Sequence, residues 1–143
     1  MRYLLDTNIL SNITKPVPSA SLLTWMAEQA DTDLFIVSLT VAEIYRGIIE
    51  KPAGKKRAAL EAWFASNEGP PSLFAGRILP FDEKAALIWG ELMAQGKAVG
   101  RQRSALDTIV AAVAQSNNCI VVTDNERDFQ GIEIINPLRA SAI

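Results

Sequence analysis

The chain of 143 residues contains no histidine and a single cysteine, Cys119. The absence of histidine excludes Ser-His-Asp and Cys-His nucleophile systems, zinc sites built on imidazole, and histidine acid–base pairs. The single cysteine excludes a disulfide within the chain, and its apolar surroundings at 119–122 predict an inert thiol in a buried strand. Any catalysis must therefore use carboxylates, lysine, tyrosine, hydroxyl groups or an oxygen-bound metal ion.

Long apolar runs and an excess of positive charge are also missing. No run approaches the ~18 residues of a membrane span, and the first residues lack the regions of a signal peptide. With 14 basic and 16 acidic residues, the net charge is −2, which argues against a broad nucleic-acid-binding surface. Binding of a nucleic acid at one local site is not excluded. We expect a cytoplasmic protein without a membrane partner.

The composition is that of an ordinary globular domain, with 49% apolar and 21% charged residues. The length predicts one domain over residues 1–143 with a core that needs no disulfide. Short apolar runs predict strands at residues 2–5, 34–37, 77–79, 120–123 and 133–135. Helical patterns cover residues 8–13, 19–29, 41–50, 55–66, 82–95 and 104–116, and a basic, glycine-containing loop covers 96–103. This alternation predicts parallel βαβ units, and thus an α/β fold with a mainly parallel sheet of about four or five strands.

Acidic residues stand just past the predicted strands or near the start of helices. Asp6 follows the first strand, Glu43 lies in the helix after the second, and Asp107 lies in the first turn of the helix at 104–116. Because the carboxyl ends of parallel strands share one edge of a sheet, we expect these three carboxylates to converge. A fourth acidic group follows the strand at 120–123, within residues 124–128.

Each acid also has a purely structural alternative. Asp6 fits a helix N-cap, and Thr40 with Glu43 fits a capping box. Asp107 has a cap-like spacing from Ser104, but it shares a helix face with apolar residues, where a carboxylate is costly unless it is paired or bound to metal. The acids of 124–128 fit a solvated loop equally well.

Converging carboxylates need a counter-charge. Two unit charges about 5 Å apart repel by roughly 3 kcal/mol at an effective dielectric constant near 20. Oxygen ligands without histidine or cysteine favour Mg²⁺ or Mn²⁺ over zinc. The acidic positions therefore indicate a magnesium or manganese site.

Four segments resemble, in order, the motifs of PIN-domain proteins. They are Leu-Leu-Asp-Thr-Asn at 4–8, Ser-Leu-Thr-Val-Ala-Glu at 38–43, the stretch 106–112 and the stretch 122–129. The likeness is strongest to the VapC and FitB toxins of bacterial type II toxin–antitoxin pairs, and residues 73–82 are FitB-like in particular. The resemblance covers essentially the whole chain and implies the three-layer α/β/α PIN fold.

The resemblance also implies a function. Members of this family are Mg²⁺- or Mn²⁺-dependent endoribonucleases, in which a metal-activated water attacks an RNA phosphodiester and the 3′ oxygen leaves. A small antitoxin that binds operator DNA inhibits the toxin, and the toxin forms a homodimer within a larger assembly. The acidic trio of the family falls on Asp6, Glu43 and Asp107, as metal ligands and catalytic residues.

The fourth acidic position departs from the family pattern. Relatives commonly carry Thr-Arg-Asn or Thr-Arg-Asp where this chain has Thr123, Asp124 and Asn125. Asn125 therefore stands in the place of a frequent aspartate, and Asp124 in that of a frequent arginine. We expect Asp128 to be the fourth catalytic acid, with Asp124 as a further candidate metal ligand; the number of metal ions stays open.

Several polar residues are candidates for orienting the acids or binding RNA. Three basic residues precede Asp107 and could bind backbone phosphates: Lys97, Arg101 and Arg103. A solvated loop without a ligand fits this segment equally well. Arg46 is a candidate for substrate or antitoxin contact. The remaining candidates flank the acids: Thr7, Asn8, Thr123 and Asn125.

Two other functions fit the same acids. A magnesium-dependent phosphatase would use Asp6 as nucleophile, but such sites carry Asp-x-Asp and residue 8 is Asn. A catalytically weak PIN domain would act mainly as an antitoxin-binding module. Trp25, Trp63 and Trp89 all fall on helix stripes, which predicts core positions or an interface with a second copy or an antitoxin helix.

Overall fold

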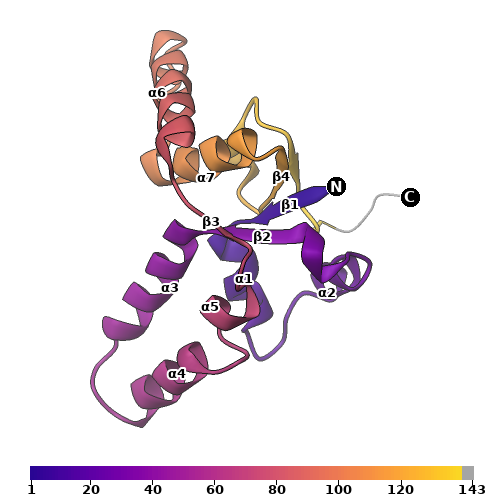
Figure 1. The fold of residues 1–143 in the computed structure, drawn as a ribbon, viewed down its shortest axis with the longest axis vertical. Coiled ribbons are helices and arrows are strands. Elements are labelled where there is room, and N and C mark those ends of the chain that lie inside the picture. Colours follow the sequence, from indigo (N-terminus) through magenta and orange to yellow (C-terminus); the bar gives the residue numbers. More distant parts are fainter. Residues whose placement is uncertain (140–143) are drawn as a thin grey trace.

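The computed structural model of the protein describes residues 1–139, which form a five-stranded parallel sheet with helices on both faces (Figure 1). The strand order is β3-β2-β1-β4-β5, and every pairing between neighbours is parallel. The strands are β1 (Arg2–Leu5), β2 (Leu34–Val37), β3 (Ile78–Leu79), β4 (Cys119–Val122) and β5 (Ile134–Ile135). The predicted three-layer α/β fold with a mainly parallel sheet is confirmed.

The helices divide between the two faces of the sheet. Helices α6 and α7 cover one face, and α1, α2, α3 and α5 cover the other (Figure 1). Helix α4 packs on α3 and α5. The bounds are α1 (Thr7–Ile13), α2 (Ala20–Ala27), α3 (Ser38–Ile49), α4 (Lys55–Ala65), α5 (Pro70–Leu73), α6 (Glu83–Ala98) and α7 (Ala105–Ser116), with the 3₁₀ turns η1 (Asp31–Asp33) and η2 (Glu126–Phe129).

The apolar strands supply two cores, one on each face. Leu4 and Val121 pack under α7, whereas their neighbours Leu5 and Val122 pack against the helices of the other face. All four side chains are fully buried. Successive strand residues point to opposite faces, so a sheet covered on both sides needs continuous apolar runs rather than alternation. This explains why β1, β2 and β4 read as unbroken apolar stretches.

Helix α7 buries its apolar stretch, with residues 110–114 all buried. It lies between the sheet and α6. Ser104 caps it by accepting a hydrogen bond from the backbone N–H of Asp107 at 3.3 Å. The cap fixes the first turn, so the carboxylate of Asp107 projects from the end of α7 that faces the carboxyl edge of the sheet.

Helix α3 departs from the sequence prediction. It begins at Ser38, directly after β2, rather than at Val41, and its N-cap residue Val37 makes no side-chain cap hydrogen bond. The capping box considered as an alternative for Thr40 and Glu43 is therefore absent. Thr40 lies inside the first turn and is fully buried, so Glu43 is not engaged in capping.

Helices α5 and α6 also differ from the predictions. The short helix α5 is an element that the sequence did not predict, and Pro70 and Pro71 fit its first turn, where proline is well tolerated. Helix α6 continues past Gly96 to Ala98. A Cβ at Gly96 would meet the carbonyl oxygen of Arg101 at 2.6 Å, so glycine here permits a close approach of the following loop.

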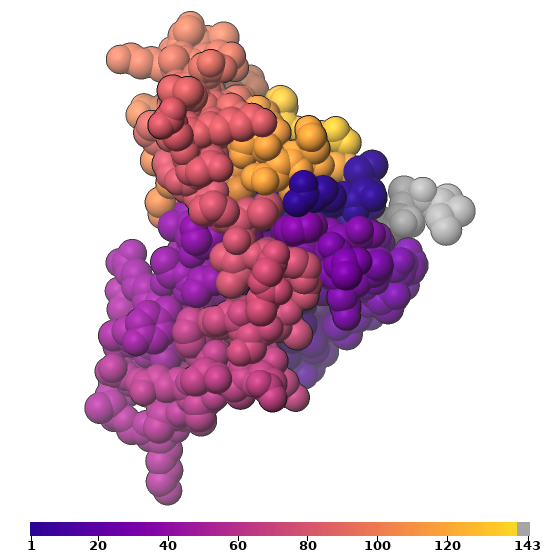
Figure 2. Space-filling model, in the orientation of Figure 1, coloured from indigo at the N-terminus to yellow at the C-terminus, as the bar shows by residue number. Residues whose placement is uncertain are grey.

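The tryptophans are all half-buried on their helices. Trp25 packs edge-on against Tyr3, with ring centroids 5.0 Å apart, and the indole N–H of Trp89 donates to the carbonyl of Ala105 at 3.0 Å. Figure 2 shows α6 and the α3–α4 pair at opposite ends of the molecule, with the first strand between them. Within residues 1–139, no helix is long and apolar enough to cross a membrane.

Candidate functional site

The carboxyl ends of three adjacent strands deliver polar residues to one place. β1 lies between β2 and β4. Asp6 follows β1, α3 follows β2, and Thr123 follows β4. The fold therefore brings Asp6, the start of α3 and Thr123 to the same edge of the sheet.

Asp6 is the most buried acid of this edge, with 5% of its surface exposed. Its Oδ1 accepts from the backbone N–H of Thr7 at 2.9 Å, which caps α1. Its Oδ2 accepts from the hydroxyl of Thr123 at 2.9 Å and from the amide of Asn8 at 3.2 Å. Asp6 thus serves as a cap and is also held rigidly toward the neighbouring strand.

Glu43 is joined to Asp6 through Thr7. The hydroxyl of Thr7 donates to Oε1 of Glu43 at 2.7 Å and lies 3.1 Å from the hydroxyl of Thr40. Thr40 is a site-supporting residue that the sequence reasoning missed, because its spacing to Glu43 suggested a cap. The sequence did contain one sign of the role of Thr40, namely a polar side chain in the turn directly after a buried strand.

Asp107 and Asp128 are linked by a neutral residue. The side-chain amide of Asn125 donates to Oδ2 of Asp107 at 3.2 Å and to Oδ2 of Asp128 at 2.8 Å. Asp128 lies in η2, a turn that the sequence analysis did not predict. The amide therefore holds two carboxylates from distant parts of the chain side by side.

Asp124 lies at the rim of the cluster. It is exposed, and its backbone N–H is 3.4 Å from Oδ1 of Asn8. The amide of Asn8 also donates to the Thr123 hydroxyl at 3.1 Å, and that hydroxyl accepts from the backbone N–H of Asn125 at 3.0 Å. Neutral hydrogen bonds thus connect the loop after β4 to Asp6.

No basic side chain neutralises these acids within residues 1–139. The three ion pairs of this part of the chain join Arg46 to Glu50, Arg57 to Glu61 and Arg139 to Glu126. Arg46 therefore pairs along its own helix, with 76% of its side chain exposed. Arg101 and Arg103 lie beside the cluster, in a separate pocket described below.

The electrostatics reflect this crowding. Burial raises the pKa of Asp6, the charges of Glu43 and Asp124 add to the rise, and the hydrogen bonds from Thr123 and Thr7 oppose it. Burial, followed by the charges of Asp6 and Asp128, raises the pKa of Asp107 to about 6. The neutral or cation-bound forms of Asp6 and Asp107 are thus more favourable than they are for ordinary surface carboxyl groups.

This shift predicts a pH-dependent effect of Asp107→Asn on stability in EDTA. A raised folded-state pKa contributes stability that is fully present below the unfolded pKa of about 3.8 and is lost as pH rises through about 6. We expect the variant to unfold at a higher temperature than the wild type at about pH 8, by about 1 kcal/mol or ~3 °C. At about pH 4 the difference should vanish; an equal difference at both pH values would contradict the shift.

The donor set suits a hard divalent cation. The acids Asp6, Glu43, Asp107 and Asp128 offer only oxygen, which Mg²⁺ and Mn²⁺ prefer. The raised pKa values of Asp6 and Asp107 mark charge that is not compensated by the protein. Within residues 1–139, however, no three acidic side chains already stand in a metal-holding arrangement. Binding would therefore require side-chain rotations at Glu43 or Asp128.

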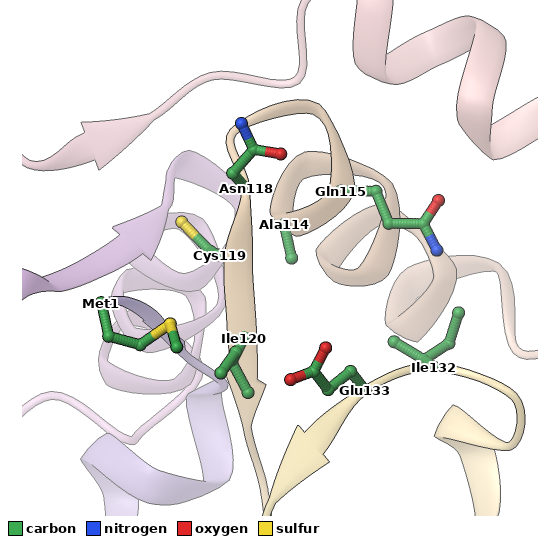
Figure 3. Close-up of a pocket in the computed structure, with 8 residues that line it drawn as sticks. All are labelled: Met1, Ala114, Gln115, Asn118, Cys119, Ile120, Ile132 and Glu133. Carbon is green, nitrogen blue, oxygen red and sulfur yellow. The ribbon is translucent and has the colours of Figure 1, made fainter.

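A larger hollow lies at the opposite edge of the sheet. It has a volume of about 420 Å³ and lies by the amino ends of the strands, where Figure 3 shows Met1, Asn118, Cys119 and Glu133 around it. Cys119 is half-buried there rather than buried as predicted, and burial raises the pKa of its thiol. The residues with clustered charge do not line this hollow.

Comparisons with known proteins agree with the fold. The family model described as PIN domain matches residues 3–134. The chain is 37% identical to VapC ribonuclease Y4jK of Sinorhizobium fredii, over 93% of this chain and 95% of that protein. It is 33% identical to toxin FitB of Neisseria gonorrhoeae, over 94% and 96%. The solved structure of FitAB bound to an IR36 DNA fragment superposes with a TM-score of 0.89 at 31% identity, covering 98% of each chain. The chain therefore belongs to the PIN-domain family, with VapC and FitB toxins among its relatives.

Proposed function

We propose that this protein is the toxin of a toxin–antitoxin pair and acts as a Mg²⁺- or Mn²⁺-dependent endoribonuclease. The observation that carries the proposal is the gathering of Asp6, Glu43, Asp107 and Asp128 without a basic partner in the described residues. The names of the relatives, a VapC ribonuclease and the toxin FitB, give the reaction and the biological context.

Asp6 and Asp107 would hold the cation directly, and Glu43 and Asp128 directly or through water, with Asp124 as an outer acid. A divalent cation at this position would supply an acidified water as nucleophile and would neutralise charge that develops on the RNA phosphodiester. The raised pKa values of Asp6 and Asp107 favour the uptake of a cation. The geometry of the acids supports this assignment because they come from four separate segments of the chain.

The neutral residues of the site would act as positioning residues. Thr7 orients Glu43, whereas Asn8 and Thr123 orient Asp6. Asn125 holds Asp107 and Asp128 together. Hydrogen bonds of this kind reduce the reorganisation that substrate binding would otherwise require.

The proposed partners follow from the relatives. FitAB is a complex bound to DNA in its solved structure. We therefore propose a small antitoxin that inhibits this chain and binds operator DNA, and a toxin homodimer inside the complex. Co-expression with the product of the adjoining reading frame should yield a stable complex and suppress growth arrest. A chain that is harmless when expressed alone would contradict the toxin assignment.

The ribonuclease assignment is tested with the purified chain and structured RNA. We expect cleavage with Mg²⁺ or Mn²⁺, and its loss on addition of EDTA with recovery when excess metal is restored. Cleavage that continues in EDTA would contradict metal dependence. No cleavage under any of these conditions, by a folded protein, would contradict the enzymatic function and favour a binding module.

A further inference from the structure

A second pocket, here called the arginine pocket, lies beside the acidic cluster. It has a volume of about 280 Å³ and is formed by the end of α6, the loop before α7 and the residues after η2. The residues that matter for its chemistry are Gly96, Val99, Arg101, Arg103, Gln130 and Gly131. Two guanidinium groups thus share one concave surface.

Arg103 carries an unsatisfied donor in this pocket. Among residues 1–139, its Nε is the one buried side-chain nitrogen or oxygen atom without a hydrogen-bond partner. Leaving a buried donor unpaired costs about 1–3 kcal/mol, and such groups in folded proteins are usually satisfied by a bound water or ion. Because Nε is buried, an anion in the pocket would meet the terminal nitrogens of the Arg103 guanidinium rather than Nε.

A purely structural role accounts for only part of Arg103. Its aliphatic stem packs on the end of α6, where its Cγ would lie 3.0 Å from a Cβ at Gly96. A terminal nitrogen lies by Gly131, 3.6 Å from where a Cβ would stand. The missing Cβ of Gly96 thus permits close packing of the stem, whereas a Cβ at Gly131 would stand at an ordinary contact distance from the guanidinium. The packing thus explains the stem, but it leaves the charged head without a partner.

Arg101 adds a second charge at the mouth of the pocket. Its Nη1 donates to the side-chain oxygen of Gln130, and its side chain is exposed. Neither arginine forms an ion pair with a carboxylate within residues 1–139. In a chain with a net charge of −2, two neighbouring guanidinium groups without acidic partners make a local site for an anion.

The position of the pocket connects it to the acidic cluster. Arg103 directly precedes Ser104, the cap of α7, whose first turn carries Asp107. Gln130 directly follows η2, which carries Asp128. The pocket is thus lined by residues that border, in the chain, the two segments that carry Asp107 and Asp128.

We propose that the arginine pocket binds a backbone phosphate of single-stranded RNA, next to the phosphodiester that is cleaved. The inference rests on the proposed ribonuclease function and adds the group that anchors the strand. A substrate phosphate approaching a cluster of carboxylates needs a compensating positive charge, and the planar guanidinium fork matches phosphate oxygens. A phosphate contact of this kind positions the strand and does not read base edges.

The test measures binding of a fluorescently labelled single-stranded RNA of mixed sequence in EDTA, where no metal-dependent cleavage occurs. Val99 is 77% exposed, so Val99→Glu adds a negative charge to the pocket without disturbing the fold, and Val99→Gln is its neutral control. Arg101→Gln and Arg103→Met each remove one charge, and the methionine keeps an apolar stem. Arg57→Gln, at an arginine paired with Glu61 on α4, is the matched control for lost charge.

We expect Val99→Glu, Arg101→Gln and Arg103→Met each to weaken RNA binding by about tenfold relative to the controls. The plot of log binding constant against log salt concentration should become less steep by about 0.7, because one phosphate contact is lost. The same variants should lower cleavage of long RNA through KM, with kcat nearly unchanged. Equal RNA affinity and salt slope in Val99→Glu, Arg101→Gln and the controls would overturn the proposal, even if Arg103→Met failed to fold.

A second arm separates an RNA phosphate from a free anion. The backbone amide signals of Gly96 and Gly131 are followed by NMR during titration with the RNA or with inorganic phosphate. The proposal expects shifts at far lower concentrations of RNA than of phosphate; equal potency would assign the pocket to a free anion instead. RNA binding is measured without metal, so the two proposals can fail separately. A protein that binds RNA in this pocket but never cleaves it would refute only the ribonuclease function.

Discussion

Asp6→Asn is expected to lower RNA cleavage by about 10³-fold while the protein stays folded. A metal ligand and its charge contribute several kcal/mol to transition-state stabilisation, and about 4 kcal/mol corresponds to a factor of 10³. The asparagine keeps the shape of Asp6 and can still accept from Thr7, as asparagine caps helices as well as aspartate does. The raised pKa of Asp6 means that a neutral side chain at this position relieves an unfavourable charge.

The matched control for Asp6→Asn is the same change at another cap. Asp82 caps α6 by accepting from the backbone N–H of Ala85 at 3.0 Å, and it is exposed. Asp82→Asn should leave cleavage unchanged. Full activity in Asp6→Asn, or equal losses in both variants, would show that the acidic edge of the sheet is not the catalytic site.

Asn125→Asp is expected to destabilise the metal-free protein strongly. The change replaces an amide that donates to Asp107 and Asp128 with a third carboxylate between them. Loss of hydrogen bonds to charged groups and the added repulsion should lower the free energy of unfolding by about 2 kcal/mol, or about 7 °C in Tm. Manganese should recover most of the loss, because the new carboxylate is a further oxygen ligand.

Thermal unfolding with EDTA and with Mn²⁺ measures this difference. Asn67 is exposed and lies between α4 and α5, so Asn67→Asp is the control for an added charge. We expect this control to unfold like the wild type in both conditions. If Asn125→Asp were as stable as the wild type in EDTA, Asn125 would not be the link between the two acids.

The sequence predicted the parts of the fold that depend on local pattern. Continuous apolar runs such as 34–37 indicated strands buried on both faces, and the apolar helix at 110–114 indicated a covered α7. The strand order β3-β2-β1-β4-β5 was not predictable in this way, because pairing depends on contacts between distant segments. The start of α3 was misplaced because Thr40 and Glu43 match a capping box by spacing alone.

The acids of the candidate site were easier to foresee than the groups that hold them. Asp6, Glu43 and Asp107 each stand near a predicted strand end or helix start, so topology alone brings them together. The role of Asn125 was hidden, since its amide links Asp107 to Asp128 only after α7 and η2 have packed. In the sequence it read as a missing acid rather than as a hydrogen-bond donor to two acids.

We propose that these carboxylates form a divalent-cation site. Titration calorimetry of Mn²⁺ into the metal-free wild type and into Asp107→Asn at about pH 8 tests it directly. We expect the wild type to bind Mn²⁺, the variant to bind at least about tenfold more weakly, and the wild-type affinity to fall as pH drops below about 6, where Asp107 takes up a proton. No binding by the wild type, or equal binding by both proteins, would contradict the account.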